Sequence, residues 1–374
     1  MGKNIIKTVF VGVSGGVDSS VAAALLIEQG YNVVGVFIRT WSPDFIKCTW
    51  KEERRDAMRV CSYLGIPFLE CDAEEAYKKG VADYMIEEYK KGNTPNPDVM
   101  CNREVKFGFF WQFAKKHGAH FIATGHYTKN NYEYYPVYDS TKSGIKKFML
   151  RKGIDTSKDQ SYFLWTLTQD DLEHTLFPIG HLEKIEVRKL AKKYRLVTAV
   201  KKDSQGVCFL GPLDMKDFLK HYIKTNTGDV IDEDGKVIGS HDGAVFFTLG
   251  ERHGFTVFKN DDNSKPLYII SKNINNNTIK VSHKLDLVER SIGSIGELHT
   301  TVQCYNANWI TSIPEKDRKY TAQIRYHGEL LKCKVDRVSH TNIEVIFDKD
   351  ILIDKGQSVV IYDGDICLGG CVVG

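Results

Sequence analysis

KTVFVGVSGGVDSSVAAALLIEQGYNVVGVFI, residues 7–38, changes its pattern three times. Residues 7–13 are mostly apolar and β-branched, which is typical of a buried strand. A Gly/Ser turn follows, and then a run of helix-forming residues that ends at Gly30. A second apolar run begins at Tyr31. The order strand, glycine turn, helix, strand predicts a βαβ unit.

The same alternation continues along the chain and predicts a doubly wound parallel sheet in roughly the first 200 residues. We expect helices at 51–64, 75–90 and 103–117, and strands at 67–71 and 120–124. Ligands of such sheets bind beyond the carboxyl ends of the strands. Residues 14–19 and 124–126 would lie at that edge.

The sequence pattern changes near residue 214, where short predicted strands and turns replace the alternating strands and helices. We expect three domains: a nucleotide-binding domain at 1–213, a small mixed, β-rich central domain at 214–289 and a C-terminal domain at 290–374. The last would close as a β-barrel, because its short antiparallel strands would otherwise leave open edges.

Composition is that of an ordinary globular protein, with 374 residues and a formal net charge of +3. No apolar run approaches the ~18 residues that span a bilayer, and the N-terminus lacks a signal-peptide pattern. We therefore expect a cytoplasmic protein without a membrane partner. A nucleic-acid surface would have to come from local clustering of charge.

The nine cysteines are widely spread, with no C-x-x-C pair. This spacing argues against a zinc knuckle or a disulfide scaffold, and favours mostly reduced, buried thiols. They stand at positions 48, 61, 71, 101, 208, 304, 333, 367 and 371.

The sharpest motif is SGGVDSS, residues 14–20, between the first strand and the first helix. Glycines let the backbone approach an oxyanion, and the helix start and the hydroxyls of Ser14 and Ser19 supply donors for phosphate. The lysine of a Walker A loop is absent, and the pattern is not G-x-G-x-x-G. The alternative is a turn that merely connects two elements. The motif resembles the PP-loop of the ATP pyrophosphatases, which split ATP into AMP and pyrophosphate.

Two further motifs each carry a cysteine. NPDVMCN, residues 96–102, lies just before a helical stretch, where a helix N-terminus would favour the thiolate of Cys101. KDSQGVCF, residues 202–209, places Cys208 in a polar stretch near glycines. Either cysteine could instead be a structural, buried thiol.

A basic cluster occupies residues 184–202, with Glu186 as the acidic residue in that span. Such a run can track RNA phosphates, although a solvated helix face is the alternative. Its members are Lys184, Arg188, Lys189, Lys192, Lys193, Arg195, Lys201 and Lys202.

Taken together, these motifs resemble the tRNA-specific 2-thiouridylase family. ATGHY at 123–127 and KDQSYFL at 158–164 join the loop and the two cysteine motifs, and the likeness continues through GSHDG at 239–243 to TLGER at 248–252 and Arg325-Tyr326. There are two departures: Glu251 stands where we expect glutamine, and residues 130–147 look like an enlarged loop. These put only peripheral RNA contacts in doubt.

The resemblance implies a role for each matching residue. Asn96, Pro97 and Asp98 would face the target base, and Cys101 and Cys208 would form the working pair. tRNA would be contacted by Lys158, Asp159, Gln160, Arg325 and Tyr326. ATP would be held by Gly12, Val13, Ser14, Gly15, Gly16, Val17, Asp18, Ser19, Ile38 and Gly125.

The implied reaction is formation of 2-thiouridine at the wobble position of tRNA. ATP would adenylate the uracil 2-oxygen, and a persulfide on Cys208 would supply sulfur while Cys101 resolves it. Asp98 could act as general acid or base. Mg²⁺ would neutralise the phosphates, with Asp18 as a possible ligand. The partners would be tRNAs such as those for lysine, glutamate and glutamine, and a persulfide donor, either a cysteine desulfurase or a relay protein.

Three alternatives stay open. The chain could be another PP-loop adenylating enzyme, such as a tRNA lysidine synthetase or an amide ligase, although the cysteine pair would then be unexplained. It could be a non-catalytic nucleotide- or RNA-binding module. Asp98, Cys101 and Cys208 could also hold an iron–sulfur cluster in place of the persulfide route, which the lack of C-x-x-C spacing disfavours.

Overall fold

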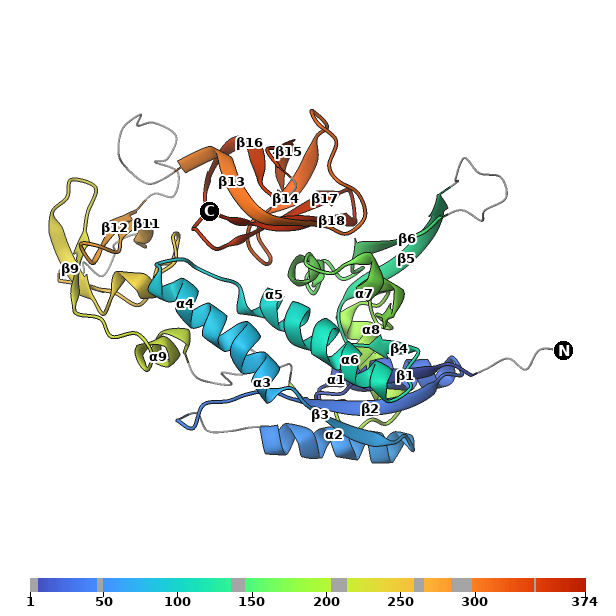
Figure 1. Cartoon of the computed structure of the whole chain (residues 1–374). Helices are drawn as coiled ribbons and strands as arrows, with labels where there is room; N and C mark the ends of the chain where they lie inside the picture. The colour runs from blue at the N-terminus through green and yellow to red at the C-terminus, as the bar shows by residue number, and fades with distance from the viewer. Residues whose placement is uncertain are drawn as a thin grey trace.

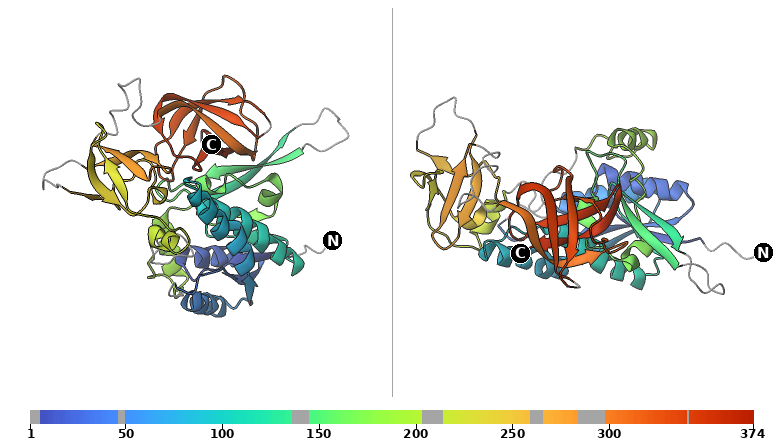
Figure 2. Two further views of the ribbon diagram at one scale, coloured as in Figure 1. Left: turned by 60° about the vertical axis from the view of Figure 1, so that its left-hand side comes forward. Right: turned by 90° about the horizontal axis from the view of Figure 1, so that it is seen from above.

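The computed structural model describes residues 6–45, 50–135, 145–202, 214–258, 266–283, 298–339 and 341–374. Cys48 and Cys208 lie outside these ranges. A parallel sheet with its helices forms one part of the molecule, the β-barrel lies above it, and the central domain lies to one side (Figure 1). The two further views keep this arrangement (Figure 2).

The first domain is built on five parallel strands, which confirms the predicted doubly wound sheet. Helix α1 (Val17–Glu28) connects the first two strands in the expected βαβ unit. In spatial order the strands are β3 (Phe68–Asp72), β2 (Asn32–Arg39), β1 (Thr8–Gly12), β4 (Phe121–Ala123) and β7 (Thr175–Leu176).

Successive side chains of β1 point to opposite faces of the sheet, and both faces are apolar and covered by helices. Val9 and Val11 point to the face covered by α1 and α2 (Trp50–Leu64). Phe10 points to the opposite face, where it packs among Phe107 and Phe110. Helix α1 is apolar on most sides, because α8 (Lys184–Lys193) covers the side that does not face the sheet.

The opposite face is covered by two long helical stretches, each with a wide π-helical segment in its middle. The expected helix at 75–90 is α3 (Glu74–Tyr77), η1 (Lys78–Asp83) and α4 (Tyr84–Lys90). The expected helix at 103–117 begins six residues earlier, because Asn96 caps it: α5 (Pro97–Cys101), η2 (Asn102–Phe109) and α6 (Phe110–Lys116).

Two short helices lie between β4 and β7 in the chain, η3 (Ser161–Leu164) and α7 (Gln169–Glu173). The central domain then starts with α9 (Met215–Lys220) and contains a five-stranded sheet. Its strands, in spatial order, are β10 (Thr256–Val257), β9 (Val237–His241), β8 (Gly228–Ile231), β12 (Thr278–Ser282) and β11 (Tyr268–Asn273), and η4 (Ala244–Phe246) follows β9.

The last part is a closed antiparallel barrel, as predicted, because its first strand also pairs with its last. Closure removes the open edges that these strands would otherwise expose. The strands are β13 (Leu298–Trp309), β14 (Tyr320–Gln323), β15 (Leu331–Arg337), β16 (Ile343–Leu352), β17 (Ser358–Asp363) and β18 (Ile366–Val373).

The interpretation of residues 130–147 as an enlarged loop was wrong for the part that the structure describes. Residues on both sides of 136–144 form a hairpin of β5 (Thr128–Tyr135) and β6 (Ile145–Lys152). β6 pairs with β18, so the hairpin from the first domain extends the barrel sheet. Figure 1 shows the hairpin reaching away from the body of the molecule. Within the described residues, no helix is long and apolar enough to cross a membrane.

Candidate active site

The phosphate loop is a compact turn held by its own hydroxyls. Gly15 has a left-handed φ of +71°, which a residue with a side chain adopts only at a cost. The Ser14 N–H donates to Ser19 Oγ at 3.3 Å, and Ser20 Oγ donates to the Gly16 carbonyl at 2.7 Å. The loop leads into the start of α1, where backbone N–H groups have no partner inside the helix. This is a suitable cradle for a phosphate.

Two neighbouring strand ends complete the cradle. A Cβ on Gly125 would lie 2.8 Å from the Ser19 nitrogen, so the TGH turn packs directly on the phosphate loop and only glycine fits. A Cβ on Gly12 would lie 3.7 Å from Cδ1 of Ile38, at the end of β2. The structure therefore brings together the three separate segments that the resemblance assigned to ATP.

The carboxylate of Asp18 is held by two side chains that the sequence did not assign to the site. Lys184 Nζ lies 2.8 Å from both carboxylate oxygens, and the Tyr127 hydroxyl donates to one of them at 2.7 Å. A capping box at Glu183 and Glu186 fixes the start of α8, where Lys184 stands. A lysine from a distant helix thus lies at the phosphate loop.

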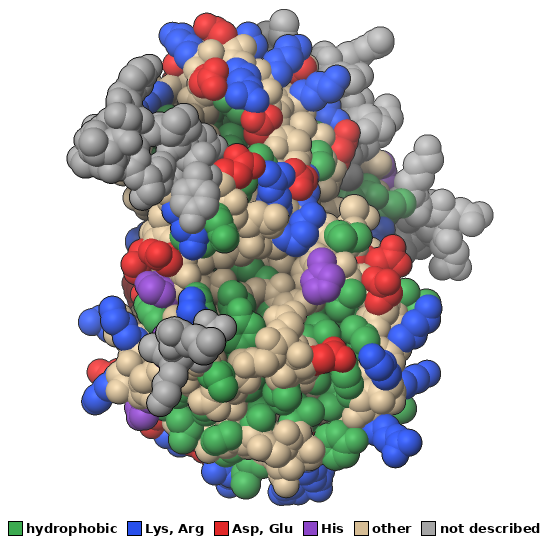
Figure 3. All heavy atoms as spheres, turned by 90° about the vertical axis from the view of Figure 1, so that its right-hand side faces the viewer, with side chains coloured by type: hydrophobic (Ala, Val, Ile, Leu, Met, Phe, Trp, Pro, Cys, Tyr) green, Lys and Arg blue, Asp and Glu red, His purple; other side chains and the backbone are tan. Residues whose placement is uncertain are grey.

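The predicted basic cluster is smaller than its sequence suggests. Lys184 pairs with Asp18, Lys201 pairs with Asp56 at 2.7 Å, and Arg188 donates to the carbonyls of residues 199 and 201. The exposed members are Lys189, Lys192, Lys193, Arg195 and Lys202. On the face of the molecule shown in Figure 3, hydrophobic side chains gather in the lower half. The basic side chains of that half lie mainly around its outer edge.

The Asn96–Cys101 segment is a capped helix start. Asn96 Oδ1 accepts from the N–H groups of Asp98 and Val99, at 3.1 and 3.2 Å. Burial raises the pKa of Asp98, and Lys106 opposes that rise. Cys101 is 3% exposed and is the fifth helical residue, one turn further in than the sequence suggested. Cys101 is therefore a buried thiol about one helical turn after the half-buried Asp98.

An aromatic contact joins this segment to the barrel. Asn102 Nδ2 donates to the Phe163 carbonyl at 3.2 Å, and the Phe163 ring lies 4.3 Å from that of Tyr326 between centroids. Burial raises the pKa of Tyr326 to about 12, and the charges of Asp159 and Asp98 add to the rise. The Phe163–Tyr326 contact thus links the barrel to the helical stretch that begins at Asn96.

The other residues expected to contact tRNA make contacts within the protein. Asp159 accepts from Gly153 N and Ser161 Oγ, at 2.9 and 2.8 Å, and burial raises its pKa. Gln160 Oε1 accepts from the Tyr127 N–H at 3.0 Å. Lys158 is half-buried beside them.

Arg325 and Glu251 also face protein groups. Arg325 Nη2 donates to the Leu249 carbonyl at 2.6 Å, and burial lowers the pKa of its guanidinium. Glu251, the departure from the expected glutamine, pairs with Lys216 at 2.8 Å. Both contacts join neighbouring segments of the molecule.

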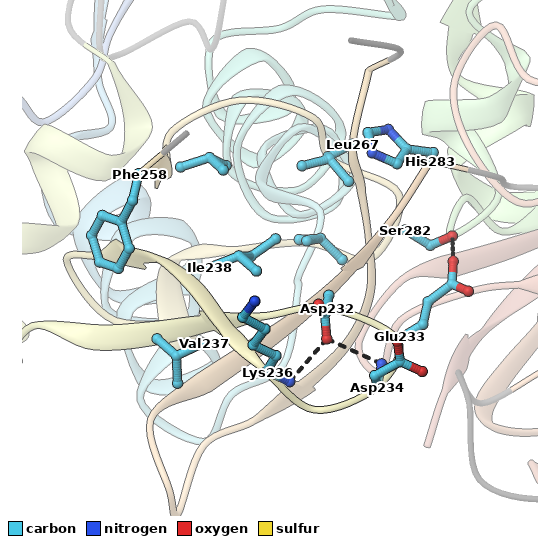
Figure 4. Close-up of a pocket in the computed structure, with 12 residues that line it drawn as sticks. Asp232, Glu233, Asp234, Lys236, Val237, Ile238, Phe258, Leu267, Ser282 and His283 are labelled. Carbon is cyan, nitrogen blue, oxygen red and sulfur yellow. Dashed lines mark hydrogen bonds between the residues drawn. The ribbon is translucent and has the colours of Figure 1, made fainter. Parts of the chain in front are cut away.

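A hollow of about 720 Å³ in the central domain has a different character (Figure 4). Asp232, Glu233 and Asp234 stand at its rim, and Asp232 accepts from the N–H groups of Asp234 and Lys236. Its lining includes no predicted site residue, and its carboxylates would repel a polyanion. This hollow therefore differs in lining and charge from the phosphate loop.

Three family models match the chain in sequence. They are described as the tRNA methyl transferase HUP domain (residues 7–212), the tRNA methyl transferase PRC-barrel domain (216–283) and the aminomethyltransferase beta-barrel domain (299–373). The solved structure of the U34-tRNA thiolase NcsA from Methanococcus maripaludis covers 59% of this chain and 64% of its own at 17% identity, with a TM-score of 0.35, a likeness too low to support a conclusion.

Two curated relatives are similar over nearly the whole chain. The tRNA-specific 2-thiouridylase MnmA of Bacillus subtilis is 41% identical over 367 residues, 97% of this chain and 93% of the relative. The protein of the same name from Exiguobacterium sibiricum is 40% identical over 372 residues, 98% of this chain and 93% of the relative. At this identity and coverage, the chain belongs to the tRNA-specific 2-thiouridylase family.

Proposed function

We propose that this chain catalyses the ATP-dependent 2-thiolation of the wobble uridine of tRNA. One observation carries the proposal: Ile38 borders both halves of the site. Its side chain lies beside Gly12 at the phosphate loop and packs against the hydrophobic cluster that contains Cys101. The end of the sheet therefore carries the phosphate loop, and Ile38 also packs against the cluster that holds Cys101, about one helical turn after Asp98.

The chemistry that fits this arrangement proceeds in two stages. The 2-oxygen of uracil attacks the α-phosphate of ATP, pyrophosphate leaves, and an O-adenylated uridine results. The terminal sulfur of a persulfide on Cys208 then attacks C2, and AMP leaves with the oxygen. The Cys101 thiolate attacks the other sulfur, so the S–S bond breaks and a Cys101–Cys208 disulfide forms, which a thiol reductant must reduce.

The residues around Asp98 suit a reaction on a uracil ring. Asn96 caps the helix through its side-chain oxygen, which fixes the backbone at the start of α5. Asp98 is the acidic residue of the first turn. A half-buried carboxyl group whose pKa is raised by burial can hold a proton for a carbonyl oxygen or a ring nitrogen, which is the role we assign to Asp98.

Mg²⁺ fits the donor set at the phosphate loop. This ion is usually held by one or two carboxylates together with substrate phosphates, and Asp18 supplies one such carboxylate. When bound, the ion would neutralise charge on the triphosphate. Lys184 and the loop N–H groups supply the protein's own positive potential there.

The partners follow from this chemistry. The sulfur donor would be a cysteine desulfurase or a relay protein able to reach Cys208. The nucleic-acid substrates would be tRNAs with a wobble uridine, such as those for lysine, glutamate and glutamine. Exposed lysines and arginines on and after α8 offer phosphate contacts at one side of the nucleotide site.

Labelled ATP tests the first stage. With tRNA and Mg²⁺, α-labelled ATP should yield AMP and γ-labelled ATP should yield pyrophosphate. Release without tRNA should be far slower, because the adenylated group is the uridine. ADP as the main product would exclude adenylation. Pyrophosphate release that persists at full rate in a Cys101→Ala, Cys208→Ala variant, with lysine or another amine consumed, would favour the rival amide-forming enzyme.

A further inference from the structure

A buried carboxylate of the barrel joins all three parts of the molecule. Asp354, between β16 and β17, is 3% exposed. It accepts from Thr94 Oγ1 at 2.8 Å and from the Leu249 N–H at 3.3 Å, and Lys272 Nζ lies 2.7 Å away. Thr94 belongs to the first domain, and Leu249 and Lys272 belong to the central domain.

The ion pair at this junction is unusually well buried. The side chains of Lys272 and Asp354 are 7% and 4% exposed. Lys272 also donates to the Phe247 carbonyl at 3.0 Å and to Thr94 Oγ1 at 3.4 Å. Because desolvation offsets much of the attraction in a buried pair, such a pair is weak evidence for stability. We therefore attribute to the buried Lys272–Asp354 pair the role of fixing the positions of the groups that it contacts.

A second set of contacts holds the same short segment of the first domain. The Thr94 N–H donates to the Lys355 carbonyl at 2.6 Å. Gly356 has a φ of +86°, and a Cβ there would lie 3.0 Å from the Thr94 nitrogen and 3.1 Å from Asn93 Cβ. The barrel turn at 354–356 therefore contacts residues 93–94 through both the side chain and the backbone of Thr94.

This segment leads directly into the site. Asn96 stands two residues after Thr94, between Pro95 and Pro97, each with a φ locked by its ring. Few backbone torsions separate Thr94 from the cap that Asn96 makes with the N–H groups of Asp98 and Val99. A shift at Thr94 must therefore move the start of α5, and with it Asp98 and Cys101.

We infer that Asp354 is a positioning residue for the thiolation reaction. Together with Lys272 it fixes Thr94, so that docking of the barrel and the central domain determines where Asn96, Asp98 and Cys101 stand. The inference rests on the proposed function for its kinetic consequence. The structural coupling from Asp354 to the start of α5 is independent of which reaction the site performs.

The kinetic test compares four single variants of the full chain. Asp354→Asn and Thr94→Val remove the charge or the hydroxyl at nearly constant volume, and Thr94→Ser restores the hydroxyl. Asp365→Asn is the matched control, because Asp365 pairs with Arg151 at 2.8 Å and also joins the barrel to the first domain, through β6. We expect Asp354→Asn and Thr94→Val to lower kcat for thiolation about 10- to 100-fold. KM for ATP should stay unchanged, and Thr94→Ser and Asp365→Asn should keep the wild-type kcat.

Hydrogen exchange of the backbone amides tests the coupling without any activity. In Asp354→Asn and Thr94→Val, the amides of residues 98–101 should exchange faster than in the wild type, while those of α6 should not. This readout decides the coupling even if thiolation proves not to be the reaction. The inference is overturned if Asp354→Asn and Thr94→Val lose only thermal stability, with the kcat and the exchange rates of amides 98–101 unchanged from the wild type. It is also overturned if Asp365→Asn lowers kcat by as much as Asp354→Asn does.

Discussion

Lys184 Nζ lies 2.8 Å from both carboxylate oxygens of Asp18, although the two residues are 166 positions apart. The phosphate loop lacks the lysine that a Walker A loop carries within its own sequence. Here the cation comes from the first residue of α8, and the Tyr127 hydroxyl also donates to the carboxylate. The surroundings of Asp18 are thus assembled from three separate segments of the chain.

Lys184→Met should abolish most of the pyrophosphate release. The variant removes a positive charge beside the triphosphate and leaves Asp18 with a carboxylate that repels it. Removing one preorganised electrostatic interaction of this kind costs about 100- to 1000-fold in kcat. Lys116→Met, at an exposed position of α6 outside the basic cluster, is the control and should release pyrophosphate normally. A fully active Lys184→Met protein would remove Lys184 from the site.

The sequence predicted the parts of the fold that depend on local pattern. The βαβ unit at 7–38, including its apolar, β-branched first strand, follows from the local pattern, and the structure confirms it. The partners of Asp18 and Thr94 could not be predicted in this way. Lys184 and Asp354 reach them through long-range packing, and in the sequence alone each is one charged residue among many.

The basic cluster shows the same limit. A run of lysines and arginines indicates a charged segment, but the sequence does not say which members are used inside the fold. Lys201 and Lys184 pair with Asp56 and Asp18, and so contribute less to an RNA surface than their number suggests. The resemblance assigned Asp159 and Arg325 to tRNA, and in the structure both hydrogen-bond within the protein.

tRNA affinity should fall linearly with salt on a log–log plot, because phosphate contacts release condensed counterions. Lys192→Glu with Lys193→Glu should weaken binding of all tRNAs alike and make the slope shallower by about one for each phosphate that the variant no longer neutralises. Lys115→Glu with Lys116→Glu, on exposed α6 positions, is the matched control. A selective effect on one isoacceptor, or equal effects of the two double variants, would reject α8 as the phosphate-binding helix.

Asp98→Asn should become more stable relative to the wild type as pH rises. Burial raises the folded-state pKa of Asp98, so its contribution is fully present below the ordinary aspartate pKa of about 3.9 and is lost as pH rises through the folded pKa. The difference in Tm between variant and wild type should therefore be more positive at pH 7 than at pH 4, by differential scanning calorimetry.

Asp56→Asn supplies a control of opposite sign. The hydrogen bond from Lys201 lowers the pKa of Asp56, so its contribution is present above the ordinary pKa and lost as pH falls through the folded value. Its variant should lose about as much stability at pH 4 as at pH 7, and the loss should shrink only as pH falls below the ordinary aspartate pKa of about 3.9. The same pH trend in both variants would mean that burial of Asp98 is not the cause.

The two working cysteines should differ when sulfur is loaded. After incubation with a cysteine desulfurase, peptide mass mapping should find one extra sulfur on Cys208 and none on Cys101. Cys61→Ser should load normally, because burial raises the pKa of that thiol to about 11 and keeps it unreactive. Extra sulfur confined to Cys101 would reverse the assigned roles. A stoichiometric iron requirement after anaerobic purification would replace the persulfide scheme with a cluster.

Mass analysis of tRNA nucleosides tests the central claim most directly. After incubation with ATP, Mg²⁺, a persulfide source and unmodified tRNA, the wobble uridine should appear as 2-thiouridine, with one AMP formed for each sulfur inserted. Both Cys101 and Cys208 should be required, whereas Cys61→Ser should behave like the wild type. A wobble uridine that stays unmodified under these conditions, or that gains a methyl group in place of sulfur, would contradict the account.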